Sequence, residues 1–267
     1  MMATPGPSGL SSMFSPQINY ERGAGIRDAL SLIDDYRGKR VLDFGCGSAP
    51  LRRRLEQGGA HWVGIDLDGP GPSVRCDGHQ LPFTDASFDI VVADAVFEHL
   101  TNPHLAAGEI ARVCRPGGHF IGYVAFLESF HSSFFHHSHR GIETVLTAGG
   151  FRVTDILPTR PGIEKLLEDM IFARRLPIVT TAVSRLVRLS LSLLKLALLG
   201  MAGIALMARH EPRSARTEKL RLYRTLLDVG YSAGLLFKAA RAPVSDGSRT
   251  TRPAWADMPP VAGQATG

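Results

Sequence analysis

The chain has 267 residues and a formal net charge of +5 at pH 7, with 44% hydrophobic and 21% charged residues. This length and composition predict one large domain, or a domain with an appendage, and they exclude collagen-like and fully disordered chains. The three cysteines include no closely spaced pair, so we expect free thiols in a reducing compartment. The first residues show neither a basic start nor an apolar run of signal-peptide length, which predicts a cytoplasmic protein.

The positive charge is concentrated in one segment. Residues 1–158 carry 13 Lys and Arg against 17 Asp and Glu, whereas residues 159–227 carry 13 against 5. The basic segment is rich in leucine and poor in aromatic residues, so its charge indicates an anionic membrane surface before it indicates nucleic acid. A peripheral position at the inner membrane face is therefore one expectation for this protein.

Helix and strand signals alternate along the chain. Apolar residues at helical spacing predict a first helix within 21–36, and residues 1–18 and 243–267 have the composition of poorly ordered tails. The nearly continuous Val and Ile runs separated by helices indicate an α/β fold with a parallel sheet covered on both faces. The predicted strands lie at 40–45, 61–67, 88–94, 119–126 and 151–157, and the predicted helices at 51–59, 105–118 and 142–150.

Two glycines follow the first predicted strand directly. Gly45 and Gly47 let the backbone approach a ligand closely, and we expect Cys46 between them to be a small buried residue of the same loop. Pro50 replaces the third glycine of the dinucleotide fingerprint G-x-G-x-x-G, which excludes a nicotinamide oxidoreductase. Asp43, just before the glycines, would repel a pyrophosphate and suits a ligand with a positive group such as an amino acid ammonium.

Asp66 ends the second predicted strand, 19 residues after Gly47. In doubly wound sheets a carboxylate at about this distance accepts hydrogen bonds from ribose hydroxyls. Asp43 and Asp66 together therefore indicate a cofactor that is a nucleoside carrying an amino acid.

Four motifs occur in order along the chain: VLDFGCG at 41–47, GIDLD at 64–68, CDGHQLPFTDASFDIVVADAVFEHL at 76–100 and EIARVCRPGGHFIGYV at 109–124. With these motifs the sequence resembles the class I S-adenosylmethionine-dependent methyltransferases, in particular their type 11 group. The resemblance implies a Rossmann-like, doubly wound, mostly parallel seven-stranded sheet with an antiparallel last strand. We expect the methyltransferase core at 19–158, a helical insertion at 159–227 and the last strand at 228–242.

The resemblance implies that S-adenosylmethionine is the cofactor. Asp43, Gly45 and Gly47, with Cys46 in the same loop, would line its methionine part, and Asp66 would hold its ribose hydroxyls. Another group of residues would contact the rest of the cofactor and the acceptor. These are Leu67 against the adenine, Asp77 on the adenine amino group, Gly78 or His79 through the backbone, and Asp94 near the methionine and the acceptor. Capping of turns at strand ends is the alternative explanation for each aspartate.

Methyl transfer to a hydroxyl or an amine needs a group that removes a proton. Among the histidines we choose His131 first for this role, ahead of His99 and His136, with a purely structural role as the alternative. The histidines at 131–139 have no accompanying cysteines or carboxylates at zinc-binding spacing, so we expect no metal.

Residues 189–208 form an apolar stretch that only Lys195 interrupts, nominally long enough to span a bilayer. A single crossing would separate the last strand from its sheet, which argues against a transmembrane helix. On a helix, Arg185, Arg188 and Lys195 fall on one side, which predicts a narrow cationic stripe that reaches lipid headgroups. A helical cap on the core or a dimer interface is the alternative.

Our first functional hypothesis is a methyltransferase for a hydrophobic or amphiphilic small-molecule or lipid-linked acceptor, with O-methylation as the preferred chemistry. A non-catalytic, membrane-associated protein of the same fold is one alternative, although the intact Asp43, Gly45, Gly47 and Asp66 count against it. A nucleic-acid methyltransferase is the other alternative. It is disfavoured because residues 94–97 are not of the Asn-Pro-Pro-Tyr/Phe type used on flipped bases. The sequence does not set the oligomeric state.

Overall fold

The computed structural model describes residues 13–23, 26–128, 133–171 and 177–242. The chain divides into two compact units. The core unit comprises Gly23–Val124, Ser132–Asp155 and Leu236–Gly267, and the helical unit comprises Met1–Arg22, Ala125–His131 and Ile156–Leu235.

A seven-stranded sheet has the strand order β3-β2-β1-β4-β5-β7-β6. β1 is parallel to β2 and β4, β2 to β3, and β4 to β5. The Thr154 hydroxyl donates to the Lys238 carbonyl and the Thr159 hydroxyl to the Gly234 carbonyl, so β6 and β7 run in opposite directions. The predicted α/β sheet, mostly parallel with an antiparallel last strand, is confirmed. Its strands are β1 (Arg40–Phe44), β2 (His61–Asp66), β3 (Val74–Arg75), β4 (Phe88–Asp94), β5 (Cys114–Ala125), β6 (Phe151–Pro158) and β7 (Gly234–Arg241).

Sequence patterns account for the core of this sheet and for its helix starts. The first six residues of β4 are buried, as expected for a strand covered on both faces. The Asn102 side chain accepts the Leu105 N–H at the start of α3, and the Ser138 hydroxyl accepts the Gly141 N–H at the start of α4. The helices of the core unit are η1 (Ala29–Leu32), α2 (Arg52–Gln57), η2 (Phe97–His99), α3 (Pro103–Val113) and α4 (His139–Ala148).

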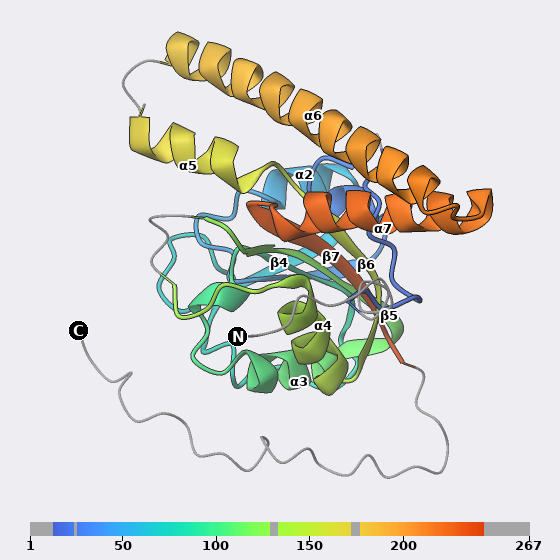
Figure 1. The fold of residues 1–267 in the computed structure, drawn as a ribbon. Coiled ribbons are helices and arrows are strands. Elements are labelled where there is room, and N and C mark those ends of the chain that lie inside the picture. The colour runs from blue at the N-terminus through green and yellow to red at the C-terminus, as the bar shows by residue number, and fades with distance from the viewer. Residues whose placement is uncertain (1–12, 24–25, 129–132, 172–176, 243–267) are drawn as a thin grey trace. The chain divides into compact units, whose positions relative to one another are not determined.

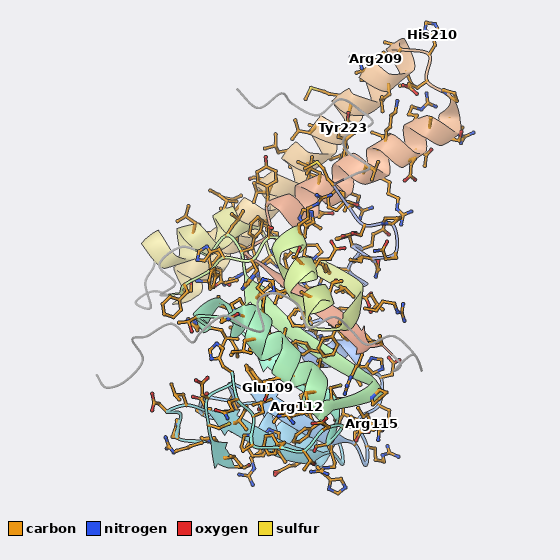
Figure 2. The ribbon with its side chains drawn as sticks, turned by 90° about the horizontal axis from the view of Figure 1, so that it is seen from below. Glu109, Arg112, Arg115, Arg209, His210 and Tyr223 are labelled. Atoms are coloured by element: carbon orange, nitrogen blue, oxygen red, sulfur yellow. The ribbon has the colours of Figure 1, made fainter. Side chains whose placement is uncertain are left out.

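Arg112 of α3 fastens the loop that precedes β4. Its guanidinium donates to the Leu81 carbonyl at 2.9 Å and to the Phe83 carbonyl at 2.7 Å. It also pairs with Glu109, whose carboxylate accepts the Leu81 N–H at 2.8 Å (Figure 2). The loop thus gains a fixed path because a charged pair satisfies its backbone groups.

The predicted helix within 21–36 is wrong. Among the described residues of this range only the single turn η1 forms, because the Asp28 carboxylate accepts the Ser31 N–H at 3.0 Å and Ile33 is already extended. Asp28 also pairs with Arg54 of α2, which ties this turn to the core unit. A polar side chain that caps a short turn here overrides the helical spacing of the apolar residues.

The predicted helix at 105–118 is too long, because α3 ends at Val113 and β5 begins at Cys114. The pairing of β4 with β5 shifts between the pair Phe88 and Cys114 and the pair Ile90 and His119, so the residues between form a bulge. Gly117 in that bulge has φ +75°, a conformation that glycine adopts readily. The predicted helix start at 51 is early by one residue, since Leu51 is the N-cap and α2 begins at Arg52.

The predicted tails fall only partly within the described residues. Residues 1–12 and 243–267 lie outside them. Phe14 is buried and packs edge-on against the Tyr20 ring with centroids 4.9 Å apart, so the tail prediction is wrong for 13–18. The aromatic pair explains why residues 13–18 pack instead of forming a tail, because two large rings bury more area than the small residues around them.

The described part of the helical unit contains three helices. α5 (Gly162–Ile171), α6 (Pro177–Ala208) and α7 (Arg213–Gly230) form it, and α7 leads into β7. Residues 228–230, predicted as the start of the last strand, belong to α7. Lys195 pairs with Asp228, and an added Cβ on Gly203 would lie 3.8 Å from Leu220 Cδ1, so α6 and α7 lie antiparallel (Figure 1).

Two of the three cations of the predicted stripe on α6 pair with acids of the neighbouring helices. Arg188 pairs with Glu164 of α5, which is 1% exposed, and Lys195 pairs with Asp228 of α7. These carboxylates offset the charge of both cations, and the Arg188 side chain remains 61% exposed. Arg185 is exposed.

Candidate functional site

The glycine loop leaves β1 through two left-handed residues. Gly45 has φ +70° and Gly47 has φ +53°. A Cβ on Gly45 would lie 2.6 Å from Val96 Cγ2, so space as well as conformation requires glycine there. Cys46 between them is buried, and burial raises the pKa of its thiol to about 11, so it remains protonated at neutral pH.

The Asp66 carboxylate holds this loop and the turn after β2. One of its oxygens accepts the Gly47 N–H at 2.7 Å, and the other accepts the N–H groups of Asp68 and Gly69, each at 3.1 Å. Burial acts to raise the pKa of Asp66, but these backbone hydrogen bonds outweigh it and hold the pKa below its ordinary value. Asp66 is therefore an anion at neutral pH. Its carboxylate oxygen that accepts the Gly47 N–H can accept a further hydrogen bond from a ligand.

Asp43 is only 2% exposed. Burial raises the pKa of Asp43 to about 6, and the negative charges of Asp94 and Asp66 add to the rise. The hydrogen bond from Trp62 Nε1 at 3.0 Å lowers this pKa but does not offset the burial. The ends of β1, β2 and β4 thus bring three carboxylates together. Such a cluster favours a ligand that carries a positive charge.

A cavity of about 280 Å³ opens at these strand ends. It is of the size that small ligands occupy. Predicted site residues that line it are Gly45, Asp66, Leu67, Asp77, Gly78 and His99. Predicted residues that do not line it are Asp43, Cys46, Gly47, Asp94 and His136. Of its lining, sequence reasoning missed Phe44, Ile65, Cys76, Ala95, Val96 and Leu100, whose apolar patterns are those of ordinary core residues.

The loop after β3 contributes a second carboxylate, held by a histidine. Asp77 accepts the His79 N–H at 2.9 Å and contacts His79 Nδ1 at 2.6 Å. His79 Nε2 accepts the Asn102 N–H at 3.2 Å, so the proton of the neutral ring lies on Nδ1. Burial acts to raise the pKa of Asp77, and the backbone and side-chain hydrogen bonds from His79 lower it overall. Sequence reasoning gave His79 only a backbone role, and its spacing of two residues from Asp77 was the available signal.

The predicted catalytic histidines lie in different places. His99 ends η2 and lines the cavity. His131 lies outside the described residues, and His136 is exposed. His137 is buried, and burial lowers its pKa, so it is neutral at pH 7. Of the predicted three, the structure places only His99 at the cavity within the described part of the chain.

The segment before α4 covers η2. The N–H groups of Phe134 and Phe135 donate to the Glu98 carbonyl at 2.8 and 3.1 Å. The Phe134 side chain is 62% exposed and that of Phe135 is 42% exposed. Two exposed aromatic rings therefore lie on the segment that follows β5 and is anchored beside His99. Within the described residues, no group of three or more His, Cys, Asp or Glu is arranged to hold a metal ion.

The helical unit contains a larger cavity of about 490 Å³. Its wall combines leucine and isoleucine side chains of α5, α6 and α7 with the segment 158–161 and the paired cations Arg188 and Lys195. No predicted site residue lines it.

Comparison with known proteins connects the core unit to one family. Residues 42–122 match the family model described as a methyltransferase domain. An uncharacterized methyltransferase of Mycobacterium sp. strain KMS is 34% identical over 139 residues, which cover 47% of this chain and 52% of that protein. The chain thus spans about half the length of the curated relatives it matches.

Two solved structures share the fold. The geranyl diphosphate C-methyltransferase of Streptomyces coelicolor is 12% identical with a TM-score of 0.51, covering 80% of this chain and 75% of that one. A chain of the complex between the Haloferax volcanii Trm112 methyltransferase activator and a methyltransferase is 20% identical with a TM-score of 0.50, covering 80% and 86%. Residues 42–122 are thus similar to the methyltransferase domain of that family, and the two solved structures show that the chain has the fold of methyltransferases.

Proposed function

We propose that this protein transfers a methyl group from S-adenosylmethionine to a hydrophobic or amphiphilic acceptor. The observation that carries the proposal is the Asp66 carboxylate, ionised, fixed by three backbone N–H groups and exposed to the cavity of about 280 Å³. That carboxylate, with the acidic cluster around Asp43, fits a ligand that has both ribose hydroxyls and a positive charge. The methyltransferase domain at 42–122 contains these groups.

Different residues around the cavity would contact different parts of the cofactor. Asp66 would accept hydrogen bonds from the ribose hydroxyls, and Leu67, which is 57% exposed beside the cavity, would cover the adenine. Asp77 and Gly78 would accept from the adenine edge. An added Cβ on Gly78 would lie 2.4 Å from the Phe44 ring, so the backbone at Gly78 packs directly against Phe44 in the cavity wall.

The methionine part would meet the glycine loop. Gly45, Cys46 and Gly47 would contact it through the backbone, and Asp43 and Asp94 would offset the ammonium charge. When bound, S-adenosylmethionine supplies an activated methyl group on a sulfonium. The protein supplies alignment, exclusion of water and a base.

His99 is our proposal for the base, because its ring lies at the cavity wall. His131 and His136 remain predicted for the same role. Phe134 and Phe135 would contact the apolar part of the acceptor, and their exposure supports an acceptor with apolar surface. A hydroxyl acceptor, and hence O-methylation, fits a histidine base.

We also propose that residues 159–227 bring the enzyme to an anionic membrane surface, which would place it at the inner face of the cytoplasmic membrane. The excess of 13 Lys and Arg over 5 Asp and Glu in this segment supports the proposal. Anionic headgroups attract such a segment within a Debye length of the surface.

Two measurements test the enzyme proposal. Calorimetry should show that S-adenosylhomocysteine binds the purified chain at one site. Incubation with methyl-labelled S-adenosylmethionine and a cell extract should then label the lipid fraction. Absence of binding would overturn the enzyme assignment, and label in the nucleic-acid fraction alone would overturn the acceptor class.

A further inference from the structure

The outer face of α6 is apolar and exposed. By helical geometry its side chains occupy an arc of roughly 160° and extend over about 32 Å. We name this the apolar face of α6. Its members, each between 52% and 68% exposed, are Leu186, Leu189, Leu193, Leu194, Leu196, Met201, Ile204 and Met207.

No charge lies on this face. Between Leu186 and Met207 the sequence contains two charged residues, Arg188 and Lys195. Arg188 Nε donates to Glu164 at 3.2 Å, and Lys195 pairs with Asp228, so both cations are neutralised by the other helices of the unit. The residues 185–208 have a mean hydropathy of 2.0 and form the one helix of the described chain that is long and apolar enough to cross a membrane.

The width and charge of the face decide between two occupants. A second copy of the chain would meet it as a coiled coil, but such seams are narrower and are flanked by charged residues of both signs. Residues 185–208 of α6 contain cations but no acidic residue, and a second copy would bring together two segments with the same excess of positive charge. An anionic bilayer accepts a wide apolar face and attracts the positive charge.

We propose that the apolar face of α6 lies in the plane of an anionic membrane, inserted at the boundary between headgroups and acyl chains. This inference rests on the membrane contact proposed above and is independent of methyl transfer. It replaces the cationic stripe expected from the sequence with an uncharged face.

The partner helix excludes a crossing orientation. α7 lies antiparallel to α6 along the side opposite the apolar face, held by Lys195 and Asp228. It carries exposed charges at Arg213, Arg221 and Arg224. A crossing α6 would draw these charges into hydrocarbon, whereas an in-plane α6 leaves them in water.

Basic residues mark both ends of the apolar face. Arg185 precedes it, and Arg209 and His210 follow it at the turn between α6 and α7 (Figure 2). All three residues are exposed. Cations at these two positions can reach headgroups while the leucines between them remain in the apolar layer.

A pair of variants separates insertion from simple charge attraction. Leu193→Asp places an acid on the apolar face, and Ser192→Asp places the same charge one residue away, off that face. We expect wild type to sediment with phosphatidylcholine vesicles containing 30% phosphatidylglycerol. Ser192→Asp should weaken this binding by about fivefold, the cost of one charge, and Leu193→Asp by at least tenfold more. Both side chains are exposed, so matched circular dichroism and thermal midpoints should show that both variants fold.

Further outcomes decide the proposal. Equal losses in the two variants, or binding that high salt abolishes completely, would leave a charge contact and overturn insertion. A wild-type dimer without lipid that Leu193→Asp converts to a monomer would assign the face to a second copy and also overturn it. Tryptophan at position 189, introduced as Leu189→Trp, should be quenched by brominated acyl chains. Binding of S-adenosylhomocysteine should be unchanged in every variant, which separates this result from a failure of the enzyme proposal.

Discussion

The core unit and the helical unit treat charge in opposite ways. In the core unit, apolar strands are buried and carboxylates such as Asp66 collect at their ends beside a cavity. In the helical unit, Arg188 and Lys195 are paired between helices and the leucines of α6 face outward. The core unit buries its apolar strands without a partner, and its carboxylates can bind a small ligand at the cavity. The helical unit exposes apolar surface that only an apolar partner covers.

The difference shows where each unit depends on something outside itself. Removing a charge from the core unit should damage ligand binding more than folding. Removing a charge from the helical unit should damage folding and leave ligand binding intact.

The largest effect is expected at Asp66. Asp66→Ala removes the acceptor for the ribose and the three hydrogen bonds that hold the loops after β1 and β2. The affinity for S-adenosylhomocysteine should fall about 100-fold by calorimetry, which corresponds to the loss of charged hydrogen bonds. Asp68→Ala is the matched control, because Asp68 takes part through its backbone N–H, and it should change affinity less than twofold. Equal affinities in the two variants would contradict the ribose role.

Asp43 should make cofactor binding depend on pH. Burial raises its pKa to about 6, so its carboxyl group is mostly protonated at pH 5 and ionised at pH 7.5. A bound ammonium favours the ionised form, so binding releases the proton. The affinity for S-adenosylmethionine should be about tenfold weaker at pH 5 than at pH 7.5, as calorimetry at the two values would show.

The variant Asp43→Asn checks the assignment and keeps an acceptor for Trp62. Its affinity should be weaker at pH 7.5 and should change little between the two pH values. The folded-state pKa lies above the unfolded value near 3.8, so wild type without ligand loses stability as the pH rises from about 4 to 6. The variant lacks that loss and should unfold at higher urea than wild type at pH 8. An unchanged urea midpoint would place the pH dependence on another group.

The sequence predicted the core unit better than the helical unit for a physical reason. Local residue spacing determines strands such as β4. The spacing of 19 residues between Gly47 and Asp66 predicted that they lie at one site, and in the structure the Gly47 N–H donates to the Asp66 carboxylate at 2.7 Å. The sequence also predicted on which side of its helix Lys195 lies. Its partner, Asp228, lies 33 residues away, and no local pattern shows that α7 folds back to neutralise it.

The same limit explains other differences in the core unit. The turn at η1 depends on the Asp28 side chain, and the early start of β5 depends on a bulge that only pairing with β4 reveals. His79 gains its position from the Asn102 N–H, which tertiary packing brings to it. Sequence reasoning finds groups that repeat at fixed spacing, and it misses those that depend on a single distant contact.

The smallest effect is expected at the pair between α6 and α7. Asp228→Asn leaves Lys195 without its anion, and because both side chains are about one-third exposed, water screens part of the loss. The free energy of unfolding should fall by about 1 kcal/mol in urea titrations. Glu218→Gln removes an exposed acid from the same helix and should change it by less than about 0.5 kcal/mol. Affinity for S-adenosylhomocysteine should be unchanged in both variants. A loss of that affinity in Asp228→Asn would show that the two units do not divide stability and ligand binding as this contrast requires.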